Sequence, residues 1–242
     1  MRTAMLALLL GAALPALADE GMWTFDNFPA AAVKAKYGAT LDSAWLDRVR
    51  RSTIRLSNCT ASFVSPEGLI LTNHHCVEAC LANLSSRDQS LVQTGFVSRS
   101  RNDEPRCATQ VADVLQAMEN VTDKVMQAIS GLDQTAANEA RTKALPQLAQ
   151  VEEESTRLKC ESVTLYQGGQ YFLYKYKRYD DVRLVLAPEA DIAAFGGDPD
   201  NFQFPRWSLD FSMLRAYENG KPAKTPDHLP IRFAGPEAGE FV

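Results

Sequence analysis

The sequence predicts a mainly β protein that is interrupted by a helical insertion. Strand-forming runs rich in Val, Ile, Leu, Phe and Tyr gather in residues 52–76 and again in residues 162–188. Between them, residues 77–158 carry apolar side chains at helical spacing. We find no internal repeat and no low-complexity linker. The expected order is therefore a β-hairpin, a helical excursion and a second set of strands.

The first 18 residues predict a secretory signal. Arg2 precedes a short apolar stretch, and Ala16, Leu17 and Ala18 supply a small-residue site for cleavage after Ala18. No later segment reaches the roughly 18 continuous apolar residues of a membrane span. We expect an exported protein, periplasmic, at the cell surface or secreted, with no membrane segment after cleavage. A net charge of −5 gives no indication of the basic face that nucleic-acid binding needs.

Short helices come first, followed by a hairpin. Residues 30–38 and 41–52 look amphipathic, and Gly38 suits the end of the first helix. Two strand-like runs then flank residues 65–68, where a proline and a glycine favour a turn. The second run, residues 69–72, leads directly to a pair of adjacent histidines.

The middle of the chain predicts two helices. Apolar residues at helical spacing indicate a first helix that ends at Gly131, with its stripe expected to be core rather than a cofactor site. A second helix is expected over residues 134–157, kinked or split at Pro146. The residues of the first stripe are Val111, Val114, Leu115, Met118, Val125, Met126 and Ile129.

Strand signals return after residue 160. Gly168 and Gly169 predict a tight hairpin within residues 162–188. A loop rich in glycine and aspartate follows, and residues 209–223 indicate two strands joined by a turn at Asn219–Gly220, with Asp210 in the first of them. The chain closes on EFV, which resembles the opening of another strand, so we expect the sequence to be truncated.

Three interpretations compete for the histidine pair, His74 and His75. A metal centre would draw on both histidines with Cys76 and Cys80, but this spacing matches none of the usual zinc patterns. A structural role beside a disulfide is the second interpretation. In the third, one imidazole is the base of a serine peptidase, which needs a histidine held rigidly beside the nucleophile and bound to a carboxylate.

Two long motifs favour the third interpretation. TASFVSPEGLILTNHHC, residues 60–76, and FGGDPDNFQFPRWSLDFSMLRAY, residues 195–217, resemble the bacterial dipeptidyl-peptidase seven and eleven family of serine exopeptidases, in the chymotrypsin-like clan. The resemblance covers roughly residues 45–242. It implies the first of two chymotrypsin-like β-barrels plus a helical segment, with the barrel begun in residues 19–76, a helical excursion in 77–158, and the remaining barrel strands in 159–242.

The resemblance also implies roles for individual residues. His75 would be the catalytic base and Asp210 its carboxylate, whereas Asn201 would bind the free N-terminal amine of the substrate beside Phe202. Known members usually have tryptophan where this chain has Phe202, and residues 207–209 depart from their usual pattern. Two aspartates beside Asn201 suit a turn, support for the pocket, or a weak calcium loop; they are Asp198 and Asp200.

Five cysteines in an exported chain predict two disulfides and one cysteine left over. We expect Cys59 to pair with Cys76 and Cys80 with Cys107, leaving Cys160.

The resemblance places the nucleophilic serine beyond residue 242, so the chain alone is expected to be inactive. It implies substrates that are peptides with a free N-terminal amine, a full-length protein able to form a homodimer, and a mechanism that needs no metal or organic cofactor. The alternative is a non-catalytic exported binding protein with a peptidase-like barrel, and a metal-dependent hydrolase comes third.

Overall fold

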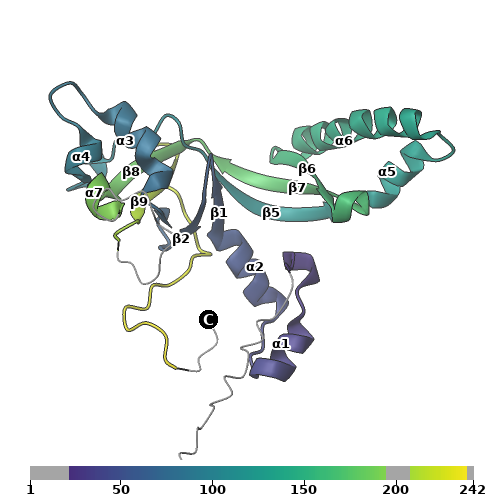
Figure 1. Ribbon diagram of the computed structural model, residues 1–242, viewed down its shortest axis with the longest axis horizontal. Helices are drawn as coiled ribbons and strands as arrows, with labels where there is room; N and C mark the ends of the chain where they lie inside the picture. The colour runs from purple at the N-terminus through teal and green to yellow at the C-terminus, as the bar shows by residue number, and fades with distance from the viewer. Residues whose placement is uncertain (1–21, 195–207, 239–242) are drawn as a thin grey trace, which may run out of the picture.

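The computed structural model describes residues 22–194 and 208–238 (Figure 1). The predicted signal in residues 1–18, the loop that carries Asn201 and Phe202, and the closing EFV lie outside these ranges. The described chain is mainly antiparallel sheet with several helices, as the sequence predicts.

The strands form one sheet in which every pairing is antiparallel. The order across it is β4-β8-β9-β3-β2-β1-β5-β7-β6, and β10 pairs with β9. The strands are β1 (Thr53–Leu56), β2 (Thr60–Phe63), β3 (Leu69–Thr72), β4 (Phe96–Val97), β5 (Ala112–Asn120), β6 (Lys159–Leu165), β7 (Gln170–Tyr179), β8 (Asp181–Ala187), β9 (Ser212–Glu218) and β10 (Lys221–Pro222).

The sheet returns on itself through one long stretch of extended chain. Only Asp180 separates β7 from β8, so this stretch pairs with β5 along β7 and with β9 along β8. The pairings then lead from β9 through β3 and β2 back to β1, which itself pairs with β5. This circuit encloses the main core, as in a small barrel.

The main core lies inside this circuit. The side chains of Ile54, Ile70, Leu184 and Leu214 are fully buried, and each comes from a different strand. Phe63 meets the Tyr179 ring edge-on, with their centroids 5.9 Å apart. Because inward residues alternate along short strands such as β1, β2 and β3, their burial fixes the register of these pairings.

Helices lie at the ends and along one side of the sheet. The two N-terminal helices are found where the sequence predicts them, and Gly38 ends the first in a left-handed conformation with φ of 70°. No helix in residues 22–194 or 208–238 is long and apolar enough to cross a membrane. The α-helices are α1 (Ala30–Tyr37), α2 (Ser43–Ser52), α3 (Glu78–Leu84), α4 (Leu91–Thr94), α5 (Thr122–Ile129), α6 (Gln134–Thr156) and α7 (Ala190–Ala193), and the 3-10 helices are η1 (Phe25–Asn27), η2 (His75–Val77), η3 (Arg101–Asp103) and η4 (Tyr166–Gly168).

The predicted helix that ends at Gly131 is wrong over its first half, because residues 112–120 form β5. A register shift between Leu115 and Ala117 inserts an extra residue, which breaks the two-residue alternation and leaves apolar residues at helix-like spacing. The side chain of Arg50, from α2, donates to the carbonyls of Leu115 and Gln116 at this irregularity. Pairing with β1 and β7 thus overrides the local pattern.

Strands β5, β7 and β6 continue away from the main core as an arm that carries α5 and α6 (Figure 1). The arm has its own small core, built on Val121, Val125, Tyr171 and Leu173. Of the kink or split expected at Pro146, the split does not occur, because α6 runs as one helix through this residue. The hairpin predicted at Gly168 and Gly169 is present, with η4 joining β6 to β7.

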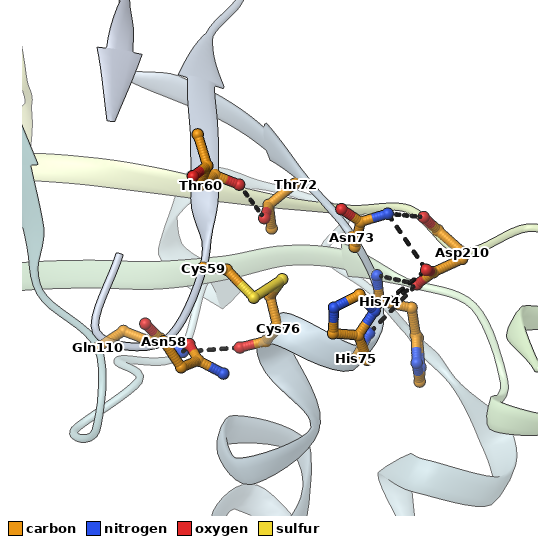
Figure 2. Close-up of a disulfide and its surroundings, with 10 residues drawn as sticks. All are labelled: Asn58, Cys59, Thr60, Thr72, Asn73, His74, His75, Cys76, Gln110 and Asp210. Carbon is orange, nitrogen blue, oxygen red and sulfur yellow. Dashed lines mark hydrogen bonds and ion pairs between the residues drawn. A yellow bond between two sulfur atoms is a disulfide. The ribbon is translucent and has the colours of Figure 1, made fainter. Parts of the chain in front are cut away.

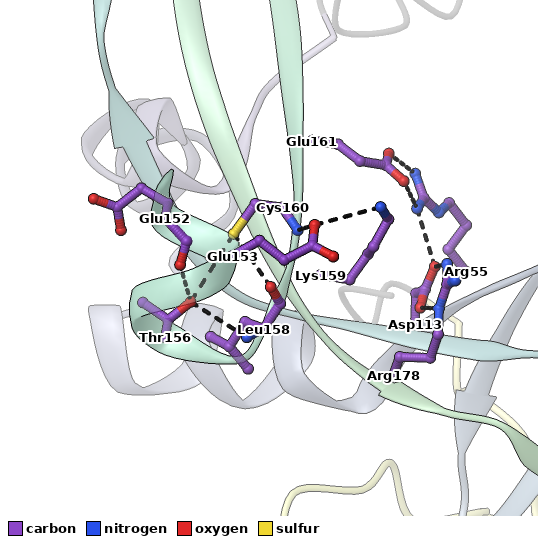
Figure 3. A network of polar contacts seen from close by, with 10 residues as sticks. All are labelled: Arg55, Asp113, Glu152, Glu153, Thr156, Leu158, Lys159, Cys160, Glu161 and Arg178. Carbon is purple, nitrogen blue, oxygen red and sulfur yellow. Dashed lines mark hydrogen bonds and ion pairs between the residues drawn. The ribbon is translucent and has the colours of Figure 1, made fainter. Parts of the chain in front are cut away.

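A buried carboxylate joins the strands where the arm begins (Figure 3). The Asp113 side chain is 3% exposed and accepts from Arg178 Nε and Nη2, both at 2.8 Å, and from Arg55 Nη2 at 3.1 Å. Arg55 also binds Glu161 on β6 and stacks over the Tyr176 ring. Burial raises the pKa of Asp113, but the two guanidinium groups lower it by more, so the carboxylate stays charged.

Truncation of Leu214, at the centre of β9, should destabilise the protein strongly. The Leu214→Ala substitution leaves a cavity in a closely packed core, with an expected loss of about 2–5 kcal/mol in the free energy of unfolding. Denaturant unfolding of the variant measures this loss. Leu132→Ala is the control. Leu132 is 46% exposed, so this substitution should change the free energy of unfolding by no more than about 0.5 kcal/mol. Equal losses in the two variants would contradict the placement of β9 in the core.

Candidate active site

The histidine pair and Asp210 meet where β3 and β9 end together. Four register pairs join the two strands, from Leu69 opposite Arg215 to Thr72 opposite Ser212. Beyond Thr72 the chain turns into η2, whose first residue is His75. Asp210 stands two residues before β9, so the prediction that it lies inside a strand is wrong. The position outside the strand lets its side chain reach the turn instead of a sheet face.

His75 and Asp210 face each other across this junction (Figure 2). His75 Nδ1 lies 3.1 Å from Asp210 Oδ2 and 3.3 Å from Oδ1. The side chain of His75 is 61% exposed and that of Asp210 32% exposed. With Nδ1 directed at the carboxylate, Nε2 is the ring nitrogen that remains to accept a proton from a reacting hydroxyl.

The carboxylate of Asp210 is held by several N–H donors. Its Oδ1 accepts from the backbone amides of His74, at 2.7 Å, and His75, at 3.3 Å. The Asn73 side chain adds a bond to Oδ2 at 3.2 Å. Burial raises the pKa of Asp210, but the bonds from His75 and His74 lower it by more, so the net pKa lies below its ordinary value. The carboxylate is therefore charged and able to stabilise an imidazolium.

The two histidines differ in exposure. His74 is 2% exposed, and its Nε2 has no hydrogen-bond partner among the described residues. His75 is therefore the member of the pair whose ring is open to solvent, whereas His74 contributes its backbone amide to Asp210.

Both expected disulfides are present. Cys59 bonds to Cys76 and Cys80 to Cys107, with Cα atoms 5.9 and 5.1 Å apart, and Cys160 is free and buried. The first disulfide fastens the residue after His75 to the chain just before β2 (Figure 2). Cys160 lies on β6 in the arm, where its Sγ faces Thr156 and the Leu158 carbonyl (Figure 3).

The donor set does not suit a metal. Of the described residues, Cys59, His75 and Cys76 bring potential ligand atoms within 4.8 Å of one another. Both sulfur atoms are joined to each other in the disulfide, so neither offers the thiolate that a zinc site requires. Cys80, the fourth candidate, is bonded to Cys107.

Ser212 is the only serine in the sequence after Asp210. It is fully buried within β9, and its Oγ has no hydrogen-bond partner among the described residues. Its place opposite Thr72 in the β3–β9 ladder keeps it inside the sheet. This chain therefore supplies a histidine and a carboxylate from this region but no accessible serine after them.

Sequence reasoning overlooked Asn73. Its amide binds Asp210 twice, and the only signal was its position directly before the histidine pair. The other candidates, Asn201 and Phe202 with Asp198 and Asp200, lie outside the described residues.

A histidine shortly after β3 and an aspartate shortly before its antiparallel neighbour β9, with Nδ1 of the ring on the carboxylate, have the geometry of the histidine–aspartate pair of a serine-type peptidase. The comparison with known families agrees with this class. Residues 18–242 match the family described as Peptidase S46, and the chain belongs to that family.

Similar proteins include two bacterial dipeptidyl-peptidases. Dipeptidyl-peptidase 7 of Phocaeicola vulgatus is 31% identical, across 98% of this chain and 37% of its own length. The Asp/Glu-specific dipeptidyl-peptidase of Shewanella putrefaciens is 32% identical, across 100% of this chain and 35% of its own. A crystal structure of Porphyromonas endodontalis DPP11 with the dipeptide Arg-Glu matches with a TM-score of 0.71 and 26% identity, over 88% of this chain and 33% of that chain. The chain thus spans about a third of the length of these relatives.

The lowered pKa of Asp210 predicts a dependence of stability on pH. Because the folded pKa lies below the ordinary value of 3.8, the charged carboxylate stabilises the fold above about that pH, and the stabilisation is lost as pH falls through the folded value. Asp210→Asn removes this contribution. The difference in unfolding free energy between the wild type and Asp210→Asn should be constant near neutral pH and shrink below about pH 4. Denaturant unfolding between pH 7 and pH 2.5 tests this, and a gap that does not change with pH would contradict it.

Proposed function

We propose that the complete protein is a serine-type dipeptidyl aminopeptidase that removes dipeptides from the free N-terminus of peptides. The observation that carries the proposal is the contact between His75 Nδ1 and the Asp210 carboxylate, in a chain of the Peptidase S46 family. The names of the relatives support the reaction class, since they are dipeptidyl-peptidases. The nucleophilic serine is proposed to follow residue 242, so the present chain would be inactive alone.

In this mechanism His75 is the general base. Its Nε2 takes the proton of the serine hydroxyl as the oxygen attacks the scissile carbonyl, and it then gives that proton to the leaving amine. The Nδ1–H group of His75 donates a hydrogen bond to the Asp210 carboxylate, which fixes the tautomer of the ring and stabilises the imidazolium. Water then releases the dipeptide by the same sequence of proton transfers. No step needs a metal or an organic cofactor.

The exopeptidase specificity is proposed to come from Asn201. An amide oxygen accepts hydrogen bonds from a protonated amine without adding a charge, and it would fix the substrate so that cleavage falls after its second residue. Phe202 would line the same pocket. The support for both roles is the resemblance of residues 195–217 to the family motif.

Export is part of the proposal. The apolar segment after Arg2 is typical of a secretory signal, and two disulfides suit an oxidising compartment. Peptides outside the cytoplasm would then be the substrates.

Substitution of either member of the pair should abolish dipeptide release. His75→Ala and Asp210→Asn are each expected to lower kcat by about 10⁴-fold or more, because the serine loses its oriented base. The measurement is release of dipeptides from a mixture of peptides with free N-termini, detected by mass spectrometry, with the protein encoded by the complete reading frame. His228→Ala is the matched control, since His228 Nδ1 lies beside the carbonyls of Thr225 and Pro226 instead of Asp210. Full activity in His75→Ala would contradict the role of His75 as the base, and a wild type without activity would contradict the proposal and favour a non-catalytic binding protein.

Recognition of the substrate amine gives a second test. Wild-type enzyme should leave N-acetylated peptides uncut, and Asn201→Ala should lower kcat/KM on free peptides by about 10- to 100-fold, as loss of a hydrogen bond to a charged group does. Steady-state kinetics on one peptide in free and acetylated forms measures both. Equal cleavage of the free and the acetylated peptide would show that the enzyme does not recognise the N-terminal amine of its substrate.

A further inference from the structure

We propose that Asn73 is a positioning residue that holds Asp210 in the orientation His75 requires. This inference rests on the proposed function, because it concerns the same histidine–aspartate pair. The observation behind it is that one side-chain nitrogen, Asn73 Nδ2, lies 3.0 Å from the backbone carbonyl oxygen of Asp210 and 3.2 Å from its Oδ2 (Figure 2).

Asn73 acts where the β3–β9 ladder stops. The last register pair is Thr72 with Ser212, and one residue further the Phe211 amide donates to the Leu209 carbonyl instead of to β3. The side chain of Asn73 replaces the missing cross-strand bond by donating to the carbonyl of Asp210. The segment before β9 therefore stays fastened to the histidine turn although the ladder has ended.

The second bond from Asn73 orients the carboxylate. Oδ1 is held by the backbone amides of His74 and His75, whereas Oδ2 meets only the Asn73 amide and His75 Nδ1 among the described residues. Asp210 is one-third exposed, so water competes for Oδ2. A fixed protein donor holds that oxygen beside His75 Nδ1 whether the imidazole is neutral or charged.

The geometry suits asparagine over similar residues. Its NH₂ group carries two hydrogens on one atom, so it can donate to two acceptors of the same residue at once. Aspartate has nearly the same shape but no donor, and it would set a second negative charge beside Asp210. Alanine removes the donor and adds no charge. Asn73 is itself exposed, so neither substitution disturbs the core.

Kinetics of Asn73→Ala and Asn73→Asp in the complete protein test the inference. Both variants should lose about 10- to 100-fold in kcat with little change in KM, since one of the two bonds lost goes to the charged Asp210 carboxylate, which does not touch substrate. Asn58→Ala is the matched control. Asn58 lies on the other side of the Cys59–Cys76 disulfide, and its side chain faces Gln110 at 3.4 Å instead of Asp210 (Figure 2).

The pH profile separates positioning from loss of structure. In Asn73→Ala the imidazolium is less stabilised, so the acid limb of kcat/KM should move to lower pH. In Asn73→Asp the added carboxylate favours the imidazolium, so the limb should move to higher pH. A loss of activity that is equal at every pH, or that follows a fall in Tm, would overturn the positioning role.

The outcomes also separate this inference from the proposed function. Wild-type kinetics in both Asn73 variants, with His75→Ala inactive, would overturn the inference and leave the peptidase proposal standing. Absence of dipeptide release by the wild type would overturn both. Opposite shifts of the acid limb in the two Asn73 variants, with Asn58→Ala unchanged, would support the positioning role of Asn73.

Discussion

The candidate site depends on the pairing of β3 with β9. His75 and Asp210 are 135 residues apart in sequence, and the four register pairs between Leu69–Thr72 and Ser212–Arg215 bring them together. Ile70 and Leu214, directly opposite each other in that ladder, are both fully buried. Since a one-residue slip would turn these side chains out of the core, the hydrophobic effect itself sets the distance between the imidazole and the carboxylate.

The turn after β3, which carries the proposed base His75, is held by several contacts. The Cys59–Cys76 disulfide ties η2 to the chain before β2, and Gln110 Nε2 donates to the Cys76 carbonyl at 2.8 Å. The backbone amides of the turn point at the Asp210 carboxylate. Covalent and polar contacts thus fix the turn, whereas packing fixes the strands that carry it. Such support by neighbouring groups is what holds a catalytic side chain in one geometry.

The arm is built on the same strands but has a separate core. Strands β5 and β7 run from the main circuit into the arm, so the two cores share backbone although their buried side chains form different clusters. The Asp113 carboxylate, with its two arginines, sits where the arm begins and joins β1 to β5 and β7. A charged group so well buried requires these partners, because an unpaired carboxylate there would cost several kcal/mol.

Local chemistry in the sequence was enough for some features. The turn at Pro66 and Gly68, the end of α1 at Gly38, and the Asn219–Gly220 turn follow from residue type and short-range spacing. The two disulfides, which were expected from the cysteine content of an exported chain, are also present. The resemblance of two long motifs to a family of serine exopeptidases indicated His75 and Asp210 from the sequence alone. What the sequence by itself determined about this protein was therefore its family and the positions of its turns and helix ends.

Only the tertiary structure decided features that arise from long-range pairing. Residues 112–120 have helical spacing but become β5, because β1 and β7 satisfy their backbone groups and a bulge hides the strand period. Helix α6 passes through Pro146 because its packing on the arm outweighs one lost hydrogen bond. The role of Asn73 depends on a partner 137 residues away, and no local pattern encodes a contact between residues so far apart.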